Sequence, residues 1–146
     1  MAQQDACTLL DDEHNEVMGM FEEYKAAHDG RRQELLAAKI NQSLQVHMKI
    51  EEEIFYPAFR RATGDDYRTD DGLREHQEAR ELLAKIDGDR QNAKLMLELE
   101  EAIRHHINDE REKMFPEARK TPSLDLMKLG EQLAARKAEL LAGVPA

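Results

Sequence analysis

The stretches HMKIEEEIFYPAFR (residues 47–60) and HINDEREKMFPEAR (residues 106–119) are two copies of one pattern. Aligned on the first histidine, both have Glu four residues later, Pro ten later and Arg thirteen later. A weaker pair, EHNE (13–16) and EHQE (75–78), precedes them. The repeat predicts two copies of one helical hairpin, each with a single-His helix followed by a His-x-x-x-Glu helix.

Helix-breaking clusters divide the chain at 28–30, 63–66, 87–89 and 120–123. Between them apolar residues recur every three or four positions, so we expect helices near 6–28, 31–62, 70–87, 90–119 and 123–142. Because the connections are short, they predict an all-α, up-down-up-down four-helix bundle over about 6–120, within a single domain spanning 1–146. The additional C-terminal helix, about 123–142, is expected to cover a flank of the bundle or a partner subunit of a homo-oligomer with the leucines Leu126, Leu129, Leu133 and Leu140.

Composition excludes several classes of protein. The chain has 146 residues and a formal net charge of −10, which disfavours binding to the phosphate backbone of nucleic acids. No apolar run approaches the roughly 18 residues of a membrane span, and the polar N-terminus does not resemble a signal peptide. Cys7 is the only cysteine, so neither an internal disulfide nor a site made of several thiolates is expected. We therefore expect a cytoplasmic protein that binds neither nucleic acid nor membrane.

Helical periodicity indicates which polar side chains point inward. At about 100° per residue, His47 and Glu51 lie within the apolar stripe of their helix, whereas Glu52 and Glu53 are predicted to face solvent. In the repeated helix the same positions are His106 and Glu110. The competing pair with the same spacing, His105 and Asp109, lies towards the polar side. Pro57 and Pro116 are expected to end or kink their helices.

Two further histidines lie on apolar stripes. His14 shares its stripe with Val17 and Phe21, and His76 is predicted to share its stripe with Leu73 and Leu83. His28 is 14 residues from His14, which corresponds to roughly 21 Å along a helix, so it cannot join the same centre.

Four imidazoles and two carboxylates are thus predicted to face the interior of the bundle near its middle. An ionised carboxylate isolated in such an interior costs several kcal/mol and therefore protonates or finds a partner. A pair of divalent or trivalent cations would serve as the common partner of all six side chains, with iron, zinc and copper suited to imidazole.

The pattern His14, His47-x-x-x-Glu51, His76, His106-x-x-x-Glu110 resembles the hemerythrin-like, or HHE cation-binding, domain over about residues 8–120. The resemblance implies a non-heme di-iron centre (two Fe2+/Fe3+ ions with oxo or hydroxo and carboxylate bridges) that meets O2, NO or peroxide. By position it implies metal ligands of two kinds: His14, His47, His76 and His106 as terminal ligands, and Glu51 and Glu110 as bridging ligands.

The sequence departs from the oxygen-carrying members of that family at Arg80. Those members have a second histidine at this position, four residues after the histidine that corresponds to His76. Arg80 is expected either to pair with a ligand glutamate or to extend towards solvent. One ligand fewer favours exchangeable small-molecule chemistry, that is, binding, sensing or detoxification of O2, NO or peroxide, over reversible O2 carriage. Three alternatives are iron storage or donation in stress repair, a di-iron peroxidase or oxidase, and a zinc-bound or metal-free interaction module.

Overall fold

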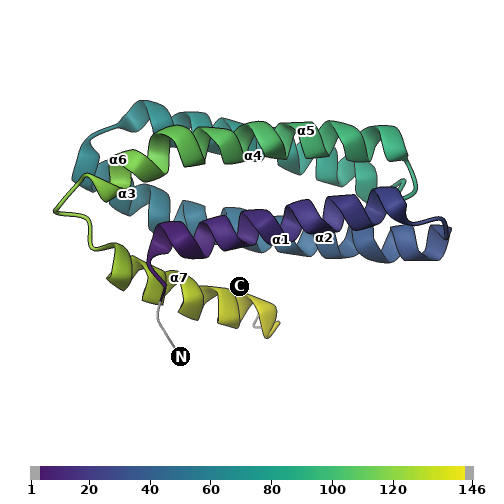
Figure 1. Ribbon diagram of the computed structural model, residues 1–146, viewed down its shortest axis with the longest axis horizontal. Helices are drawn as coiled ribbons and strands as arrows, with labels where there is room; N and C mark the ends of the chain where they lie inside the picture. Colours follow the sequence, from purple (N-terminus) through teal and green to yellow (C-terminus); the bar gives the residue numbers. More distant parts are fainter. Residues whose placement is uncertain (1–3, 144–146) are drawn as a thin grey trace.

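The computed structural model describes residues 4–143, which form helices joined by short connections. The bundle contains α1 (Ala6–Ala26), α2 (Gly30–Ile50), α4 (Asp66–Asp87) and α5 (Ala93–Asp109). Figure 1 shows α1 and α2 as one antiparallel pair beside the pair α4 and α5. The predicted four-helix bundle with an additional C-terminal helix is confirmed, and the breaks between its helices lie where glycine and aspartate cluster.

Each of these helices begins at an acidic or amide cap. The side chains of Asp5, Asp29, Asp65 and Asn92 accept a hydrogen bond from a backbone N–H in the first turn of α1, α2, α4 and α5. Such a cap satisfies one of the orphan donors at a helix start and stabilises a helix by about 1 kcal/mol.

Two helices of the bundle change their winding near their C-terminal ends. After α2 the chain forms the π-helical segment η1 (Glu51–Phe55) and then α3 (Tyr56–Thr63); after α5 it forms η2 (Glu110–Met114) and then α6 (Phe115–Arg119). The expectation that Pro57 and Pro116 end or kink these helices is only partly met, because helix continues beyond both prolines. Since proline has no N–H, a wider turn before it lets the chain continue without the missing hydrogen bond.

The fifth long helix, α7 (Leu126–Leu141), lies across α1 and α2 (Figure 1), so it covers a flank of the bundle. Leu129 and Leu133 are buried in that contact. Gly130 makes the close approach, because a Cβ at this position would lie 2.0 Å from the backbone oxygen of Gln4.

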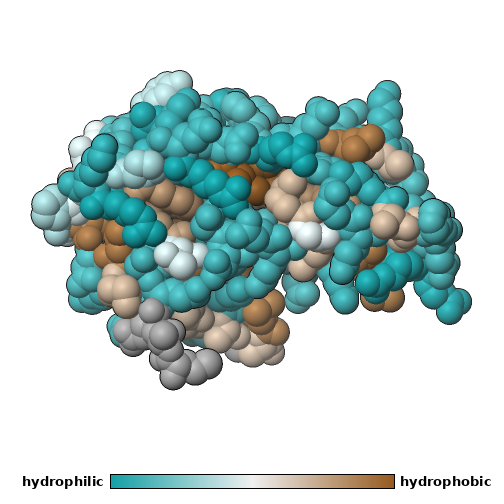
Figure 2. All heavy atoms as spheres, in the orientation of Figure 1, coloured by the Kyte–Doolittle hydropathy of each residue, from teal (hydrophilic) through white to brown (hydrophobic). Residues whose placement is uncertain are grey.

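The apolar core is divided into two clusters. One fills the end that contains the α1–α2 and α4–α5 connections, around Phe21, Tyr24 and Leu99. The other lies around Phe55, Phe59 and Leu133, where α3, α6 and α7 pack. On the face in Figure 2, hydrophilic residues dominate and hydrophobic ones appear mainly in seams between helices. Among residues 4–143, no helix is both long and apolar enough to span a membrane.

We predict that Gly130→Ala destabilises the fold by about 1–3 kcal/mol, because the new methyl group overpacks against the backbone at the start of α1. Gly19→Ala is the matched control: nothing lies within 4 Å of its Cβ position, so the better helix former should add up to about 1 kcal/mol. Urea unfolding of both variants measures the difference. Equal stability of Gly130→Ala and the unchanged protein would contradict the close docking of α7.

Candidate metal centre

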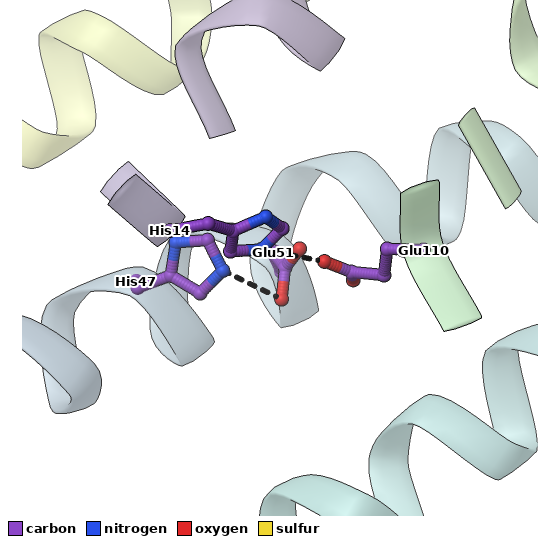
Figure 3. A group of neighbouring side chains, drawn as sticks. All are labelled: His14, His47, Glu51 and Glu110. Atoms are coloured by element: carbon purple, nitrogen blue, oxygen red, sulfur yellow. Dashed lines mark ion pairs between the residues drawn. The ribbon is translucent and has the colours of Figure 1, made fainter. Parts of the chain in front are cut away.

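All six residues singled out in the sequence meet in the middle of the bundle, between the two apolar clusters. The four histidines come from α1, α2, α4 and α5, and the two glutamates are the first residues of η1 and η2. Every one of the six is buried: His14, His47, Glu51, His76, His106 and Glu110. Figure 3 shows His14 and His47 together on one side of Glu51, with Glu110 facing it from the other.

The two carboxylates lie between two pairs of imidazoles. Glu51 Oε1 is 3.3 Å from His47 Nε2 and 3.0 Å from His76 Nε2. The carboxylate of Glu110 lies 2.9 Å from His14 Nε2 through one oxygen and 3.2 Å from His106 Nε2 through the other. Each glutamate therefore contacts at least one histidine from each hairpin. The donor atoms form two overlapping groups, each compact enough to surround one cation: His14, His47, Glu51 and Glu110 in the first, and Glu51, His76 and His106 in the second.

Every one of these imidazoles also has a carboxylate behind it, at Nδ1. Asp11, Glu13, Glu52 and Glu75 lie 3.0, 2.6, 2.7 and 2.6 Å from the Nδ1 atoms of His14, His47, His76 and His106, in that order. An ionised carboxylate only accepts hydrogen bonds, so Nδ1 carries the proton and donates. This arrangement fixes the ring orientation and directs Nε2 towards the centre, as in the carboxylate–histidine pairs that orient metal ligands.

Three of these four outer carboxylates form an ion pair with an arginine or lysine side chain. Asp11 pairs with Arg111, Glu13 with Lys137 of α7 at 2.8 Å, and Glu52 with Arg80 at 2.9 Å. Both expectations for Arg80 were therefore wrong: it neither contacts a central glutamate nor points freely into solvent, but holds Glu52 behind His76. The prediction that Glu52 is solvated was also wrong, since its side chain is three-quarters buried against His76.

Tyr56 is a central residue that the helical pattern missed. Its hydroxyl donates to Glu110 Oε2 at 2.8 Å and lies 3.3 Å from both Glu51 Oε1 and His76 Nε2. On a regular α-helix, Tyr56 would be about 140° from Glu51 and would point away from it. The π turn of η1 brings residues five apart to the same side, with the Tyr56 N–H bonded to the Glu51 carbonyl. The feature of the sequence that could have indicated this π turn is Pro57, directly after the tyrosine.

Tyr56 also explains an error in α4. We expected Leu73 on the inner stripe with His76, but Leu73 is 39% exposed. Gly72 faces inward instead, and a Cβ there would lie 2.7 Å from the Tyr56 hydroxyl oxygen. The tyrosine ring thus occupies the space that a larger side chain on α4 would need.

Burial and mutual charge shift the ionisation of the central groups in opposite directions. Burial favours neutral imidazole, yet the carboxylates of Glu51 and Glu13 outweigh it and raise the pKa of His47 to about 10. Burial would raise the pKa of Glu51, but the surrounding histidines hold it well below its usual value. Burial, with Glu110 and Glu51 nearby, raises the pKa of the Tyr56 phenol, which keeps it a proton donor at neutral pH. Against the effect of burial, the neighbouring carboxylates also raise the pKa of His106, so the His47 and His106 rings supply positive charge beside the buried carboxylates.

Several buried atoms at the centre lie close to one another but form no hydrogen bond among residues 4–143, among them His14 Nε2, His47 Nε2, Glu51 Oε2 and Glu110 Oε1. Unsatisfied atoms of this kind cost about 1–3 kcal/mol each and are rare in native interiors. All four belong to the first of the two groups, and imidazole nitrogen with carboxylate oxygen suits iron or zinc. The first group therefore fits a cation, and the second group offers the same kinds of donor.

The histidines left out of the prediction lie elsewhere. His28 is exposed at the end of the bundle, and the side chain of His105 is 68% exposed, against 6% for its neighbour His106.

A family model described as the hemerythrin HHE cation-binding domain matches residues 5–118. The chain belongs to this family. A crystal structure of a hemerythrin HHE cation-binding domain-containing protein from Mycobacterium kansasii is similar to this chain with a TM-score of 0.78 at 20% sequence identity. The match covers 96% of this chain and 89% of that one, so it supports the fold, α7 included. No curated protein matches the chain.

We predict that Tyr56→Phe lowers the stability of the metal-free protein by about 1.5–3 kcal/mol, the usual contribution of a hydrogen bond to a charged group. The ring should still fit, because Phe115 takes the equivalent place in the second repeat, where it stacks on His14 as Tyr56 stacks on His76. Tyr67→Phe, at a residue 75% exposed, is the control. If urea unfolding in chelator gives both variants the same stability, the Tyr56 hydroxyl does not stabilise the centre.

Proposed function

We propose that the chain holds two non-heme iron ions, with His14, His47, His76 and His106 as terminal ligands and Glu51 and Glu110 as bridging ligands. The observation that carries this proposal is the position of the two glutamates, each in contact with histidines of both hairpins. A carboxylate in that position serves two cations at once. Such an iron pair, when bound, supplies reversible electron exchange with O2, NO or peroxide.

A small apolar cavity beside the histidines supports a diatomic ligand. It has a volume of about 10 Å3 and is lined on the apolar side by Val17, Leu44, Met48, Ile103 and Ile107. That volume holds about one water-sized molecule. Polar residues including Glu13, Ser43 and Glu75 also border it, but the surface that faces the cavity is almost entirely apolar, so the cavity suits O2 or NO better than water. We therefore propose binding or sensing of such a molecule as the function.

A second candidate function, turnover of peroxide, is favoured by a different observation. A cleft of about 40 Å3 reaches the centre from the side of α4 and α5, and Tyr56, Glu75, His106 and Glu110 line its inner part. Reduction of hydrogen peroxide to water takes up protons and electrons. The Tyr56 hydroxyl is a hydrogen-bond donor at this end of the centre, and the electrons would come from an external reductant. A polar cleft of this size admits more than one water-sized molecule.

We predict that Glu51→Ala and Glu110→Ala each lose both ions together, since a bridging carboxylate serves both. Iron per chain and the absorption spectrum are measured after loading with Fe2+ in air. The unchanged protein should hold two irons and show near-ultraviolet charge-transfer bands. Glu112→Ala removes an exposed acid of the same η2 segment and should keep both. Full iron content in either central variant would contradict the bridging assignment.

The two candidate functions are separated by adding NO, without air, and peroxide to the iron-loaded protein. Saturable spectral change with NO and no sustained loss of peroxide supports binding or sensing. With ascorbate added as electron donor, sustained peroxide consumption that Tyr56→Phe slows supports the peroxidase.

A further inference from the structure

A second cluster of candidate ligands lies at the surface, directly behind the central histidine His106. It consists of Glu75 from α4 with His105 and Asp109 from α5. His105 Nε2 lies 3.2 Å from Glu75 Oε2 and 3.3 Å from Asp109 Oδ2. One imidazole and two carboxylates thus converge from two helices, one α-helical turn separating His105 from Asp109. Because His105 is largely exposed, the cluster is open to solvent.

Glu75 differs from the other three carboxylates that hold a central histidine. Asp11, Glu13 and Glu52 each pair with an arginine or lysine, whereas no described lysine or arginine forms an ion pair with Glu75. Its nearest partner on the outer side is the His105 ring, which carries no permanent charge. Behind the other three histidines the outer carboxylate is paired with an arginine or lysine side chain. Behind His106 the corresponding neighbour of the carboxylate is His105, a residue type that binds metals.

The outer oxygen of Glu75 has no hydrogen bond. Glu75 is buried, with 7% of its surface exposed. Its Oε1 accepts a hydrogen bond from His106 Nδ1 at 2.6 Å, whereas its Oε2 has no hydrogen-bond partner among residues 4–143. That orphan oxygen faces His105 and Asp109. Lys113 approaches Asp109 through its other oxygen, Oδ1, at 3.7 Å, which leaves Oδ2 facing the cluster. A cation there would satisfy Oε2 and balance both carboxylates.

We propose that Glu75, His105 and Asp109 form a solvent-facing site for a divalent cation, separate from the buried pair. Three protein ligands from imidazole and carboxylate leave further positions for water, which suits Zn2+, Mn2+ or Fe2+ and weak, exchangeable binding. Glu75 joins this site to the buried centre, because its two oxygens face His105 on one side and His106 on the other.

The site also stands at an entrance to the buried centre. Glu75 and Asp109 both line the cleft that continues to Tyr56, His106 and Glu110. We assign to it the role of taking up the cation before the buried residues do, a role that rests on the proposed function. The existence of the site does not rest on it.

Equilibrium binding of Zn2+ tests the site itself, because Zn2+ suits the same ligands and undergoes no redox change. The unchanged protein should bind three Zn2+ per chain, and His105→Ala and Asp109→Asn two. His28→Ala removes the other exposed histidine and should retain three. Circular dichroism verifies that each variant is folded. Equal Zn2+ binding by His105→Ala and the unchanged protein would overturn the site.

Two further outcomes are informative. If the buried pair does not exist, the unchanged protein binds one Zn2+ and His105→Ala none, so failure of the proposed function is distinguished from failure of this site. Stopped-flow loading with Fe2+ tests the entry role: His105→Ala should fill the centre more slowly than His28→Ala, to the same final iron content. Equal loading rates would overturn that role.

Discussion

Four hydrogen bonds between carboxylates and imidazole Nδ1 atoms hold the middle of the bundle, and much of the remaining architecture depends on them. Each fixes one histidine ring so that its Nε2 faces Glu51 or Glu110. Without them, buried imidazoles would rotate and their partner carboxylates would remain unsatisfied in a low-dielectric interior, at a cost of several kcal/mol. The apolar clusters on both sides of the centre supply the stabilisation that a polar middle cannot.

The repeat explains two of these four bonds, those that Glu13 and Glu75 accept. Glu13 and Glu75 each precede a central histidine and reach across to the next helix of their own hairpin. The two copies of the hairpin differ in the residues that contact the outer carboxylates and in one aromatic residue beside the centre. Lys137 from α7 forms an ion pair with Glu13, whereas His105 faces Glu75. Tyr56 supplies a hydroxyl where the second copy has Phe115, so the two sides of the centre are chemically unequal.

The sequence predicted most of the fold because helix-breaking clusters and a regular apolar period agreed over long segments. It also predicted the inward direction of all six central side chains, since Glu51 and Glu110 follow their histidines by one α-helical turn. Apolar periodicity no longer predicted side-chain directions beyond Glu51, because the chain changes from α-helix to the π-helical segment η1 before Pro57. A regular α-helical period therefore could not place Tyr56 at the centre, and Leu73 was placed where Gly72 belongs. Contacts between helices, such as those of Arg80 with Glu52 or Lys137 with Glu13, depend on rotamers and on packing that no local period encodes.

The central claim is that Glu51 and Glu110 join two metal ions held by four oriented histidines. Anomalous diffraction at the iron edge, from crystals of protein loaded with iron, tests it most directly. The account predicts two anomalous peaks in the middle of the bundle, one beside His14 and His47 and the other beside His76 and His106, both in contact with the two glutamates. A single peak, or peaks that avoid Glu51 and Glu110, would contradict it.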